Sequence, residues 1–432
     1  GINQPMTNEQ KQHQQLVLNF LDAPTGYGKT TAIINKVNRE IPEGYFGNPK
    51  RFLVVTPFID EVTRICKETA CTAPIGNKSK DIQTLLADGE NICCTHSLFN
   101  LFSTETLEII STGGYSYSLI IDEEINVISD IMGNKTIRNK ENPSLIESYS
   151  KKDFEILIKQ EQISIDPLTK KISWNDDYSY DDGVFDDLRK RLEIVDLFRF
   201  GSGLIQMVKR ELWECFNEVT ICSYRMKESY LAYYCRLSNI GINYQHIENG
   251  VIVNGYLPLK PKKLDRIKLY PDQRNKECSY SKYWYQQNIK KDFISKAAKQ
   301  LTADFRKFKE TFVPKGVDKS LYFWTCYKGY EKALAGKNLS KNKWQPCNIK
   351  ATNKLVACCI VGYFVNRFAN VNVKRFLKDT GGIIVNEEEL ALSELIQFVW
   401  RSNIRTDDLN DVYVFIAADA LLNNFSEWLK DE

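Results

Sequence analysis

The chain has 432 residues, of which 43% are hydrophobic and 26% are charged, and its formal net charge is +3 at pH 7. These values are typical of an ordinary globular protein with sizeable hydrophobic cores, long enough for two or three domains. The small net charge neither requires nor excludes a nucleic-acid partner, so any basic surface must be local.

The sequence disfavours a membrane protein and a metal-cluster protein. No uninterrupted apolar run approaches the roughly 20 residues of a membrane-spanning helix, and no charged-then-apolar signal stands at the start. We therefore expect a cytoplasmic protein with no membrane partner. The twelve cysteines occur singly or as the pairs Cys93-Cys94 and Cys358-Cys359, without C-x-x-C spacing. Such cysteines are better explained as small buried hydrophobes than as metal ligands.

The predicted elements of the first half alternate between apolar strands and amphipathic helices. Strands are predicted at residues 16–21, 51–57, 91–96, 118–124 and 218–224, with a helix at 59–65. This alternation is typical of a parallel sheet covered on both faces. Polar residues follow each strand, at the sheet edge where ligands bind in open α/β folds.

A large insertion, at about residues 130–215, separates the fourth and fifth predicted strands. Residues 163–165 and 171–174 read as the two strands of a hairpin. The acidic segment 176–187 follows. We expect it to form a solvated loop rather than a metal site.

A second α/β region is predicted toward the C-terminus. A helix at 230–237 and a strand at 243–253 lead into the basic, aromatic stretch 260–291. Two interpretations of that stretch stay open: it stacks bases and contacts phosphates, as single-strand channels do, or it is an amphipathic packing layer. The elements predicted beyond it are strands at 321–325, 346–350 and 412–417, and helices at 354–368, 389–404 and 418–429.

The fold class that follows is α/β, with parallel sheets in two tandem domains. We expect the first domain at residues 1–226, a linker and basic accessory segment at 227–317, and the second domain at 318–432.

The stretch Ala23–Thr31 is the strongest chemical signal. A strand that ends in a glycine-punctuated turn and then begins a helix presents backbone N–H groups to an anion, and the helix dipole adds to the attraction. Lys29 would reach the β- and γ-phosphates of a nucleotide, and the Thr30 hydroxyl would complete the coordination of Mg²⁺. The match to G-x-x-x-x-G-K-[ST] is offset, because Ala23 replaces the first glycine. The predicted cradle comprises Thr25, Gly26, Gly28, Lys29, Thr30 and Thr31.

The carboxylates after the fourth strand are the partner that a phosphate loop needs. Asp122 follows a buried apolar run and would hold Mg²⁺ through water, while Glu123 would orient the attacking water. Glu124 competes for either role. ATP and Mg²⁺ are therefore the expected cofactors.

Near the C-terminus, Gln397, Arg401 and Arg405 are spaced by four residues. On a helix they would share one face. Two buried guanidiniums need an anionic partner, and the γ-phosphate of a nucleotide is one. Arg401 is the candidate arginine finger, whereas Arg405 is either a second finger or part of an ion pair between domains. A solvated arginine face is the structural alternative.

The spelling A-x-T-G-x-G-K-T at residues 23–30 resembles motif I of the superfamily 2 helicases and translocases, the DEAD/DEAH-like group. Residues 397–405 are similar to motif VI of that group, Q-x-x-G-R-x-x-R, except that Trp400 replaces the glycine and the second arginine comes one position late. The sequences of these motifs also resemble those of helicase-like ATPases encoded by bacteriophages and prophages.

Weaker matches to the same superfamily follow in the expected order. Residues 220–224 stand where the Ser-Ala-Thr motif belongs, and residues 322–328 and 349–353 resemble motifs IV and V. The resemblance implies contacts to a nucleic-acid backbone from Thr56, Pro57, Thr95, His96, Thr352 and Asn353. Thr95 and His96 would equally serve as the N-cap pair of a helix.

The resemblance implies two RecA-like domains that hydrolyse ATP between them and move along or unwind nucleic acid, DNA rather than RNA. Other replication or recombination proteins are candidate partners. Two alternatives stay open. One is a DNA-packaging motor resembling a terminase, which would ordinarily carry a nuclease domain after its ATPase. The other is a nucleotide-gated remodelling ATPase that does not unwind.

Overall fold

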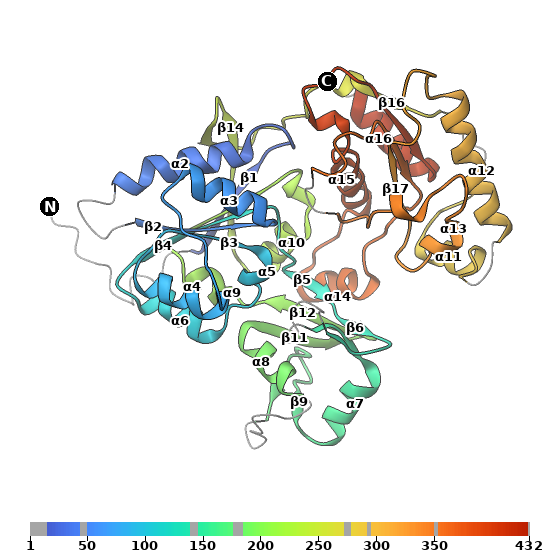
Figure 1. Ribbon diagram of the computed structural model, residues 1–432. Coiled ribbons are helices and arrows are strands. Elements are labelled where there is room, and N and C mark those ends of the chain that lie inside the picture. The colour runs from blue at the N-terminus through green and yellow to red at the C-terminus, as the bar shows by residue number, and fades with distance from the viewer. Residues whose placement is uncertain are drawn as a thin grey trace. The chain divides into compact units, whose positions relative to one another are not determined.

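The computed structural model describes residues 15–43, 50–138, 146–175, 185–271, 278–291, 295–349 and 353–430. The chain divides into two compact units. The N-terminal unit consists of residues 1–23, 28–258 and 370–385, and the C-terminal unit of residues 24–27, 259–369 and 386–432. Residues 227–317, expected as a separate segment, are therefore shared between the two units. Figure 1 labels many of the elements of both units.

The N-terminal unit is built on a seven-stranded sheet in the order β15-β14-β1-β13-β4-β2-β3. All neighbouring strands are parallel except the edge pair β14 and β15. The five strands predicted for this region are confirmed. The strands are β1 (Val17–Asp22), β2 (Lys50–Thr56), β3 (Ile92–Thr95), β4 (Ser116–Asp122), β13 (Glu218–Ser223), β14 (Gly241–Glu248) and β15 (Val251–Asn254).

The central strands of this sheet are buried along continuous apolar runs. Residues 52–55 of β2 and 119–121 of β4 are fully buried, as expected where helices cover both faces of a parallel sheet. The helices of the sheet region are α2 (Lys29–Glu43), α3 (Ile59–Glu68), α4 (Lys78–Ala87), α5 (His96–Phe99), α6 (Thr104–Thr112), α9 (Arg210–Glu214), η1 (Met226–Glu228) and α10 (Tyr230–Leu237). The predicted helices at 59–65 and 230–237 are thus present.

The insertion between β4 and β13 folds around a core of its own. Tyr149, Phe154, Leu157, Leu188 and Leu197 are among its buried residues. The predicted hairpin is confirmed, because Ile163 pairs with Trp174 in antiparallel register. Residues 176–184 of the acidic segment lie outside the described residues. The elements are β5 (Ile128–Asp130), β6 (Met132–Gly133), β7 (Ile137–Arg138), β8 (Ile146–Ser150), α7 (Lys151–Lys159), β9 (Ile163–Ile165), β10 (Ile172–Trp174), α8 (Asp186–Ile194), β11 (Val195–Phe200) and β12 (Gly203–Val208).

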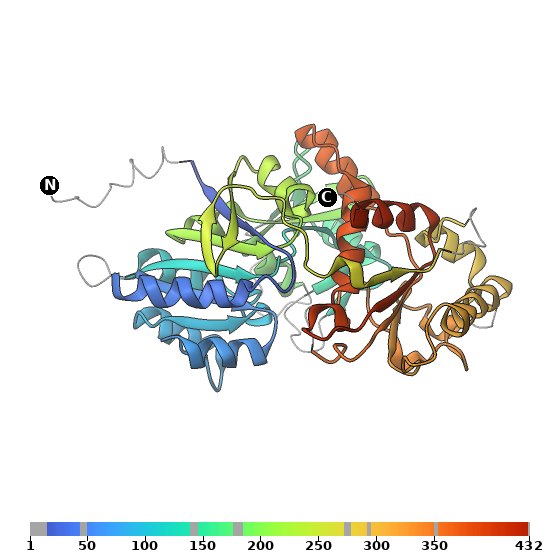
Figure 2. The ribbon, with the colours of Figure 1, turned by 90° about the horizontal axis from the view of Figure 1, so that it is seen from above.

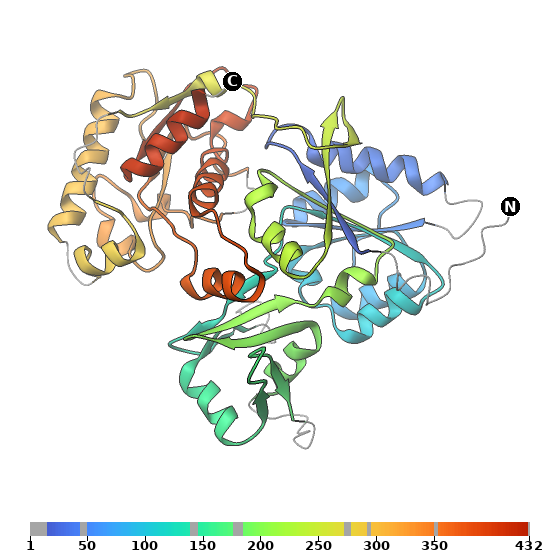
Figure 3. The ribbon, with the colours of Figure 1, turned by 180° about the vertical axis from the view of Figure 1, so that it is seen from behind.

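A helix from late in the sequence, α14 (Val371–Gly381), belongs to the N-terminal unit. It packs on the sheet β11-β12-β5 of the insertion, and Figures 1 and 3 both show it beside these strands. The ring of Phe376 lies 5.0 Å from that of Phe198 and 5.4 Å from that of Phe200, measured between centroids. The amide of Asn372 donates to Asp130 Oδ2 over 2.8 Å. The chain therefore enters this unit a second time.

The C-terminal unit contains a four-stranded parallel sheet in the order β16-β19-β18-β17. Its strands are β16 (Ile267–Leu269), β17 (Tyr322–Thr325), β18 (Ile360–Tyr363) and β19 (Val412–Ile416). Its helices are η2 (Leu264–Arg266), α11 (Lys282–Asn288), α12 (Lys296–Thr311), α13 (Glu331–Leu334), η3 (Lys341–Lys343), α15 (Glu387–Val399), η4 (Asn403–Arg405) and α16 (Asp419–Lys430). The fold class predicted from the sequence, α/β with parallel sheets, is confirmed.

Aromatic side chains fill the core on both faces of this sheet, and the ribbon of its strands and helices is drawn in Figure 2. Neighbouring residues of a strand point to opposite faces. Accordingly Tyr322 meets Phe305 of α12 at 5.8 Å between centroids, while Phe323 meets Phe398 of α15 at 5.0 Å. The sheet is thus covered by α12 on one face and by α15 on the other.

The predictions for residues 346–350 and 354–368 of the C-terminal unit are wrong. The segment predicted as a helix at 354–368 contains β18, because the buried run from Ile360 to Tyr363 pairs with both β17 and β19. Short apolar runs do not distinguish a buried strand from a buried helix by periodicity. Residues 346–349 form no strand, and Lys350 lies outside the described residues.

Candidate nucleotide-binding site

The segment between β1 and α2 forms the predicted strand, turn and helix. The Tyr27 amide donates to the Pro24 carbonyl over 3.2 Å, and the Ala32 amide donates to the Gly28 carbonyl over 2.8 Å. Gly26 and Gly28 have φ values of +86° and +80°. Non-glycine residues rarely adopt such values, so the glycines are required by backbone conformation.

Side chains from three elements converge after this turn. Lys29 Nζ donates to the Ala23 carbonyl over 3.0 Å. Thr30 Oγ1 lies 3.5 Å from Asp122 Oδ2 and 3.4 Å from Glu61 Oε2. Thr31 is exposed on the next position of α2. The structure therefore brings together Lys29, Thr30 and Asp122, whose proximity the sequence predicted, and adds Glu61 of α3, which the sequence analysis missed.

Asp122 is the buried charge of this cluster, with 5% of its surface exposed. Its pKa is raised to about 7, with burial as the largest cause; the nearby carboxylates of Glu123 and Glu61 add to the shift, and Lys29 and Thr30 oppose it. A divalent cation beside such a carboxylate favours the ionised form.

Glu123 stands at the end of β4 in a left-handed conformation, with φ of +66°. Its amide donates to the Cys222 carbonyl of β13 over 2.9 Å. Such a conformation costs on the order of 1 kcal/mol or more for a residue other than glycine. The strand pairing on both sides thus holds Glu123 in an unfavourable backbone geometry at the edge where the phosphate loop lies.

The sequence analysis missed the role of Asp22, the last residue of β1. Its carboxylate accepts hydrogen bonds of 2.9 Å from the backbone amides of both Arg225 and Met226. Burial raises the pKa of Asp22, and these two hydrogen bonds oppose the shift. An aspartate that closes an apolar strand directly before the glycine turn was the available signal.

The charge of Asp22, and not that of Asp122, is among the main influences on the pKa of Glu124. The pKa of Glu124 is raised to about 8, with burial as the largest cause and the Asp22 carboxylate as the next, while a hydrogen bond to Ser229 opposes the shift. The nearby charges that act on Asp122 are those of Glu123, Lys29 and Glu61. This arrangement favours Glu123 over Glu124 as the second acidic group of the site.

The candidate nucleic-acid contacts of the N-terminal unit follow β2 and β3. Thr56 is fully buried, and among the described residues its hydroxyl has no hydrogen-bond partner, while Pro57 is half-buried. Thr95 is the N-cap of α5 and accepts from the Leu98 amide. His96 is buried, with Nε2 2.7 Å from the Asp122 carbonyl. In this structure His96 therefore contacts the end of β4.

The C-terminal candidates do not share a helical face, so that prediction is wrong. Helix α15 ends at Val399, two residues before Arg401. Ser402 caps the segment that follows, because its hydroxyl donates to the Val399 carbonyl at the end of α15 and accepts from the Ile404 amide of η4. Serine competes for backbone groups in this way and favours helix boundaries.

These candidates also differ in exposure. Arg401 is only 3% exposed, whereas Gln397 and Arg405 are half-buried. Asn353 is exposed, and Thr352 lies outside the described residues. Arg401 is thus the most buried of the candidates in the C-terminal unit.

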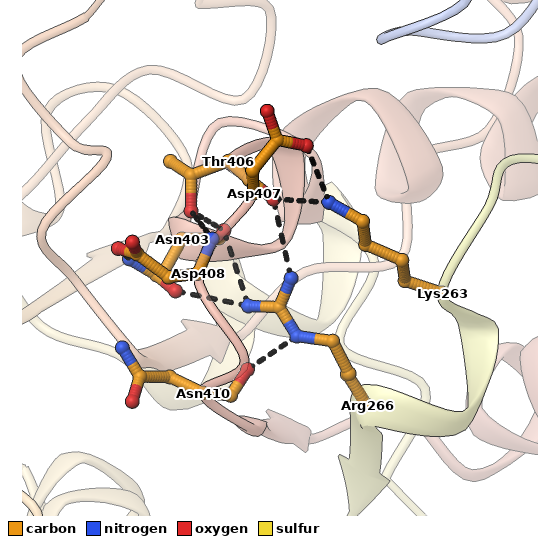
Figure 4. Close-up of polar contacts among 7 residues, drawn as sticks. All are labelled: Lys263, Arg266, Asn403, Thr406, Asp407, Asp408 and Asn410. Atoms are coloured by element: carbon orange, nitrogen blue, oxygen red, sulfur yellow. Dashed lines mark hydrogen bonds and ion pairs between the residues drawn. The ribbon is translucent and has the colours of Figure 1, made fainter.

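A buried arginine that the sequence analysis did not single out holds the segment after Arg401 (Figure 4). Arg266 donates to the Asn403 side chain over 2.9 Å, to the Thr406 carbonyl over 3.3 Å and to the Asn410 carbonyl over 2.5 Å. The neighbouring Lys263 donates to Asp407 and to the Thr406 carbonyl. Most of the acceptors are backbone carbonyl oxygens, which every residue has. No sequence pattern therefore indicates this cluster.

Within the described ranges no group of three or more His, Cys, Asp or Glu side chains is placed to hold a metal ion. A Mg²⁺ ion commonly takes one or two carboxylates together with substrate phosphates and water, which suits Thr30 and Asp122. None of the helices in the described part of the chain has both the length and the apolar character of a membrane span.

Comparison with known proteins gives two sequence relationships. Residues 262–429 match a family model described as the YonV C-terminal Rossmann-like domain. The chain is also 27% identical, over 445 aligned residues, to the SPbeta prophage-derived uncharacterized protein YonV of Bacillus subtilis (strain 168), covering 95% of this chain and 98% of that protein.

Two solved structures of XPD proteins are similar in fold. The structure of S. tokodaii Xpd4 aligns with a TM-score of 0.50 at 12% identity, covering 98% of this chain and 95% of that one. An apo XPD structure aligns with a TM-score of 0.45 at 13% identity, covering 95% of each chain. The likeness to Xpd4 concerns the fold and agrees with the predicted pair of RecA-like domains.

Proposed function

We propose that this protein is an ATP-hydrolysing helicase or translocase of superfamily 2, related to prophage-encoded proteins and acting on nucleic acid in the bacterial cytoplasm. The observation that carries the proposal is the convergence of Lys29, Thr30 and Asp122 beside a glycine turn at the carboxyl edge of a parallel sheet. The fold likeness to XPD and the sequence likeness to a prophage-derived protein support it.

The residues of the cluster fit ATP and Mg²⁺. Thr30 and Asp122 offer a hydroxyl and a carboxylate oxygen within 3.5 Å of each other, the oxygen ligands that Mg²⁺ prefers. Lys29 extends back over the turn, where its ammonium group would meet a phosphate. Bound Mg²⁺ would supply charge neutralisation at the phosphate oxygens.

Each side chain has one proposed task. Thr25, Gly26, Gly28 and Thr31 shape the turn that surrounds the phosphates. Lys29 binds the β- and γ-phosphates, and Thr30 with Asp122 holds the metal. Glu123 accepts the proton of the attacking water, and its strained backbone keeps the carboxylate at the strand edge.

In the C-terminal unit, Arg401 is the proposed arginine finger, with Gln397 and Arg405 as further phosphate contacts. Thr56, Pro57, Thr95, His96, Thr352 and Asn353 are the proposed contacts to the nucleic-acid backbone, with DNA the preferred polymer. Since Thr56 and His96 are buried in this structure, these two contacts require a rearrangement at the ends of β2 and β3.

The test is ATP hydrolysis measured with and without single-stranded DNA, duplex DNA and RNA, together with a strand-displacement assay. We expect stimulation by DNA, and hydrolysis without any stimulation would contradict the motor function. Lys29→Ala and Glu123→Gln should abolish turnover, and Glu123→Gln should still bind ATP. Lys67→Ala, at an exposed lysine of α3, is the matched control.

A further inference from the structure

The positive charge of this chain is concentrated in one segment. Residues 259–369 contain 25 Lys and Arg against 8 Asp and Glu, a formal charge of +17 in a chain whose total is +3. The rest of the chain is therefore acidic. A strongly local charge of this kind marks the electrostatic footprint of a polyanion-binding surface.

Part of this charge is neutralised within the fold. Lys263 pairs with Asp407 at 3.0 Å, and Lys268 lies 4.0 Å from Asp411. These lysines precede or lie within β16 and face the acidic segment before β19. They leave little charge for an external partner.

Unlike Lys263 and Lys268, four lysines on or near α11 and α12 have no acidic partner among the described residues. Lys282 is the first residue of α11 and Lys290 lies two residues after its end. Lys296 and Lys299 lie in the first turn of α12, and all four lysines are exposed. Within the described part of the chain, no acidic side chain forms an ion pair with any of them. Their charge is available to solvent.

These helices lie on one side of the C-terminal unit. Helix α12 contacts both α11 and α13, and Figures 1 and 3 show the three helices together. Arg306 of α12 and Lys332 of α13 are also exposed. Tyr283 of α11, the residue after Lys282, adds an aromatic ring with 71% of its surface exposed.

The buried side chains of the same helices make the packing contacts of these helices. Phe305 and Phe308 of α12 pack against the sheet, and Tyr285 of α11 is fully buried. Lys309, by contrast, is held over the Tyr322 ring at 4.3 Å, and burial lowers its pKa. Packing therefore accounts for Lys309 but not for Lys282, Lys290, Lys296 or Lys299.

We propose that the exposed face of α11 and α12 binds the phosphate backbone of a nucleic acid, with Lys282, Lys290, Lys296 and Lys299 as the phosphate contacts and Tyr283 as a stacking platform. Lysine contacts to phosphate are independent of sequence and weaken with salt. An exposed aromatic ring beside them suits an unpaired base.

An anionic membrane is the other polyanion that lysines attract, and the helix geometry disfavours it. A membrane-surface helix inserts its own apolar face into the lipid. The apolar face of α12 is instead committed to the core through Phe305 and Phe308. The surface consists of other residues than the candidate nucleotide site, so the inference does not depend on ATP hydrolysis.

The test compares two variants of the full chain that lose the same charge. In the first, Lys282, Lys290, Lys296 and Lys299 are replaced by Gln. In the second, the exposed Lys135, Lys151, Lys152 and Lys159 of the insertion are replaced by Gln. Affinity for a labelled single-stranded oligonucleotide and a labelled duplex is measured by anisotropy across a salt series, without ATP.

We expect the first variant to bind at least about tenfold more weakly, with the slope of log K against log salt smaller in magnitude by about 3, and the second to bind like the native chain. Replacing the same four lysines of α11 and α12 by Arg should retain affinity, which separates lost charge from lost folding. Equal affinities of the two Gln variants would overturn the proposal, as would binding of the native chain to phosphatidylserine vesicles but not to the oligonucleotides. ATP hydrolysis without nucleic-acid stimulation would contradict the motor function alone.

Discussion

The carboxylate of Asp22 accepts a 2.9 Å hydrogen bond from the backbone amide of Arg225. Asp22 ends β1, where the phosphate-loop turn begins, and Arg225 follows β13, the parallel neighbour in which Ser223 is paired with Asp22. The Met226 amide donates to the second carboxylate oxygen. One buried side chain thus fixes the turn after β13 relative to the start of the phosphate loop.

Asp22→Ala should lower the free energy of unfolding by about 2–4 kcal/mol, because it leaves two backbone amides without an acceptor in a largely buried position. Asp22→Asn keeps one acceptor oxygen and should lose less. Urea denaturation measures both, with Asp60→Ala at an exposed position of α3 as the control. Equal stability of Asp22→Ala and the native chain would show that these hydrogen bonds are not needed.

The same variants should reduce ATP affinity if the turn after β13 supports the phosphate loop. The effect is measured by nucleotide titration under conditions in which the variant is folded. A destabilised variant with native ATP affinity would limit the role of Asp22 to stability.

Arg266→Ala should destabilise the C-terminal unit by about 3 kcal/mol. Arg266 is buried, and its removal leaves the Asn403 side chain and the Thr406 and Asn410 carbonyls without this donor. Arg266→Lys keeps the charge but not the planar fork, so we expect an intermediate loss. The measurement is chemical denaturation followed by tryptophan fluorescence.

Lys263→Ala is the matched control for Arg266. Its partner Asp407 is exposed, and an exposed ion pair contributes little. A loss for Lys263→Ala as large as that for Arg266→Ala would contradict the distinction between the buried and the exposed donor. We expect only Arg266→Ala to lower ATP turnover as well, because Arg266 holds the segment that directly follows the proposed arginine finger, Arg401.

The local features of the candidate site could be predicted from the sequence, because each of them depends on residues that are close together in the chain. The strand before Ala23 and the glycines of the turn are encoded within about ten consecutive residues, and their conformational requirements are specific. Asp122 at the end of a buried strand is equally local. These features could be predicted without knowing which distant residues contact them.

Features that depend on distant partners could not be predicted in this way. Arg266 is buried because backbone carbonyls about 140 positions later accept its hydrogen bonds, and arginine alone predicts exposure. The helix expected at 389–404 ends at Val399, and the Ser402 hydroxyl donates to the Val399 carbonyl in competition with backbone amides. The membership of α14 in the N-terminal unit rests on contacts to Phe198 and Asp130, which no sequence pattern near residue 376 indicates.

Phe376→Ala should loosen α14 from the insertion. Phe376 is buried and contacts the rings of Phe198 and Phe200, and truncating a buried phenylalanine costs about 3–5 kcal/mol. We expect faster amide hydrogen exchange in α14 and β11 than in the native chain. Arg375→Ala, at an exposed position of the same helix, should leave the exchange unchanged. Unchanged exchange for Phe376→Ala would contradict the packing of α14 on this sheet.

His246 of β14 provides a pH dependence outside the candidate site. Its Nδ1 lies 2.7 Å from the Gly255 carbonyl, and its Nε2 lies 2.8 Å from Glu248 Oε1. Both partners are acceptors, so only the doubly protonated ring satisfies both contacts. The hydrogen bond to Glu248 is the main reason that the pKa of His246 is raised, and the Gly255 carbonyl adds to it.

A histidine with a raised pKa binds its proton more tightly in the folded state than in the unfolded state. Its contribution to stability is therefore complete below the unfolded value of about 6.5 and is lost as the pH rises through the folded value. Because Glu248 is largely exposed, the loss should be below about 1 kcal/mol. Thermal unfolding of the native chain and of Glu248→Gln, compared between about pH 6 and about pH 8, should show a smaller decline for the variant. Glu90→Gln, at an exposed glutamate elsewhere in the unit, should decline like the native chain, and identical profiles for all three proteins would refute the assignment.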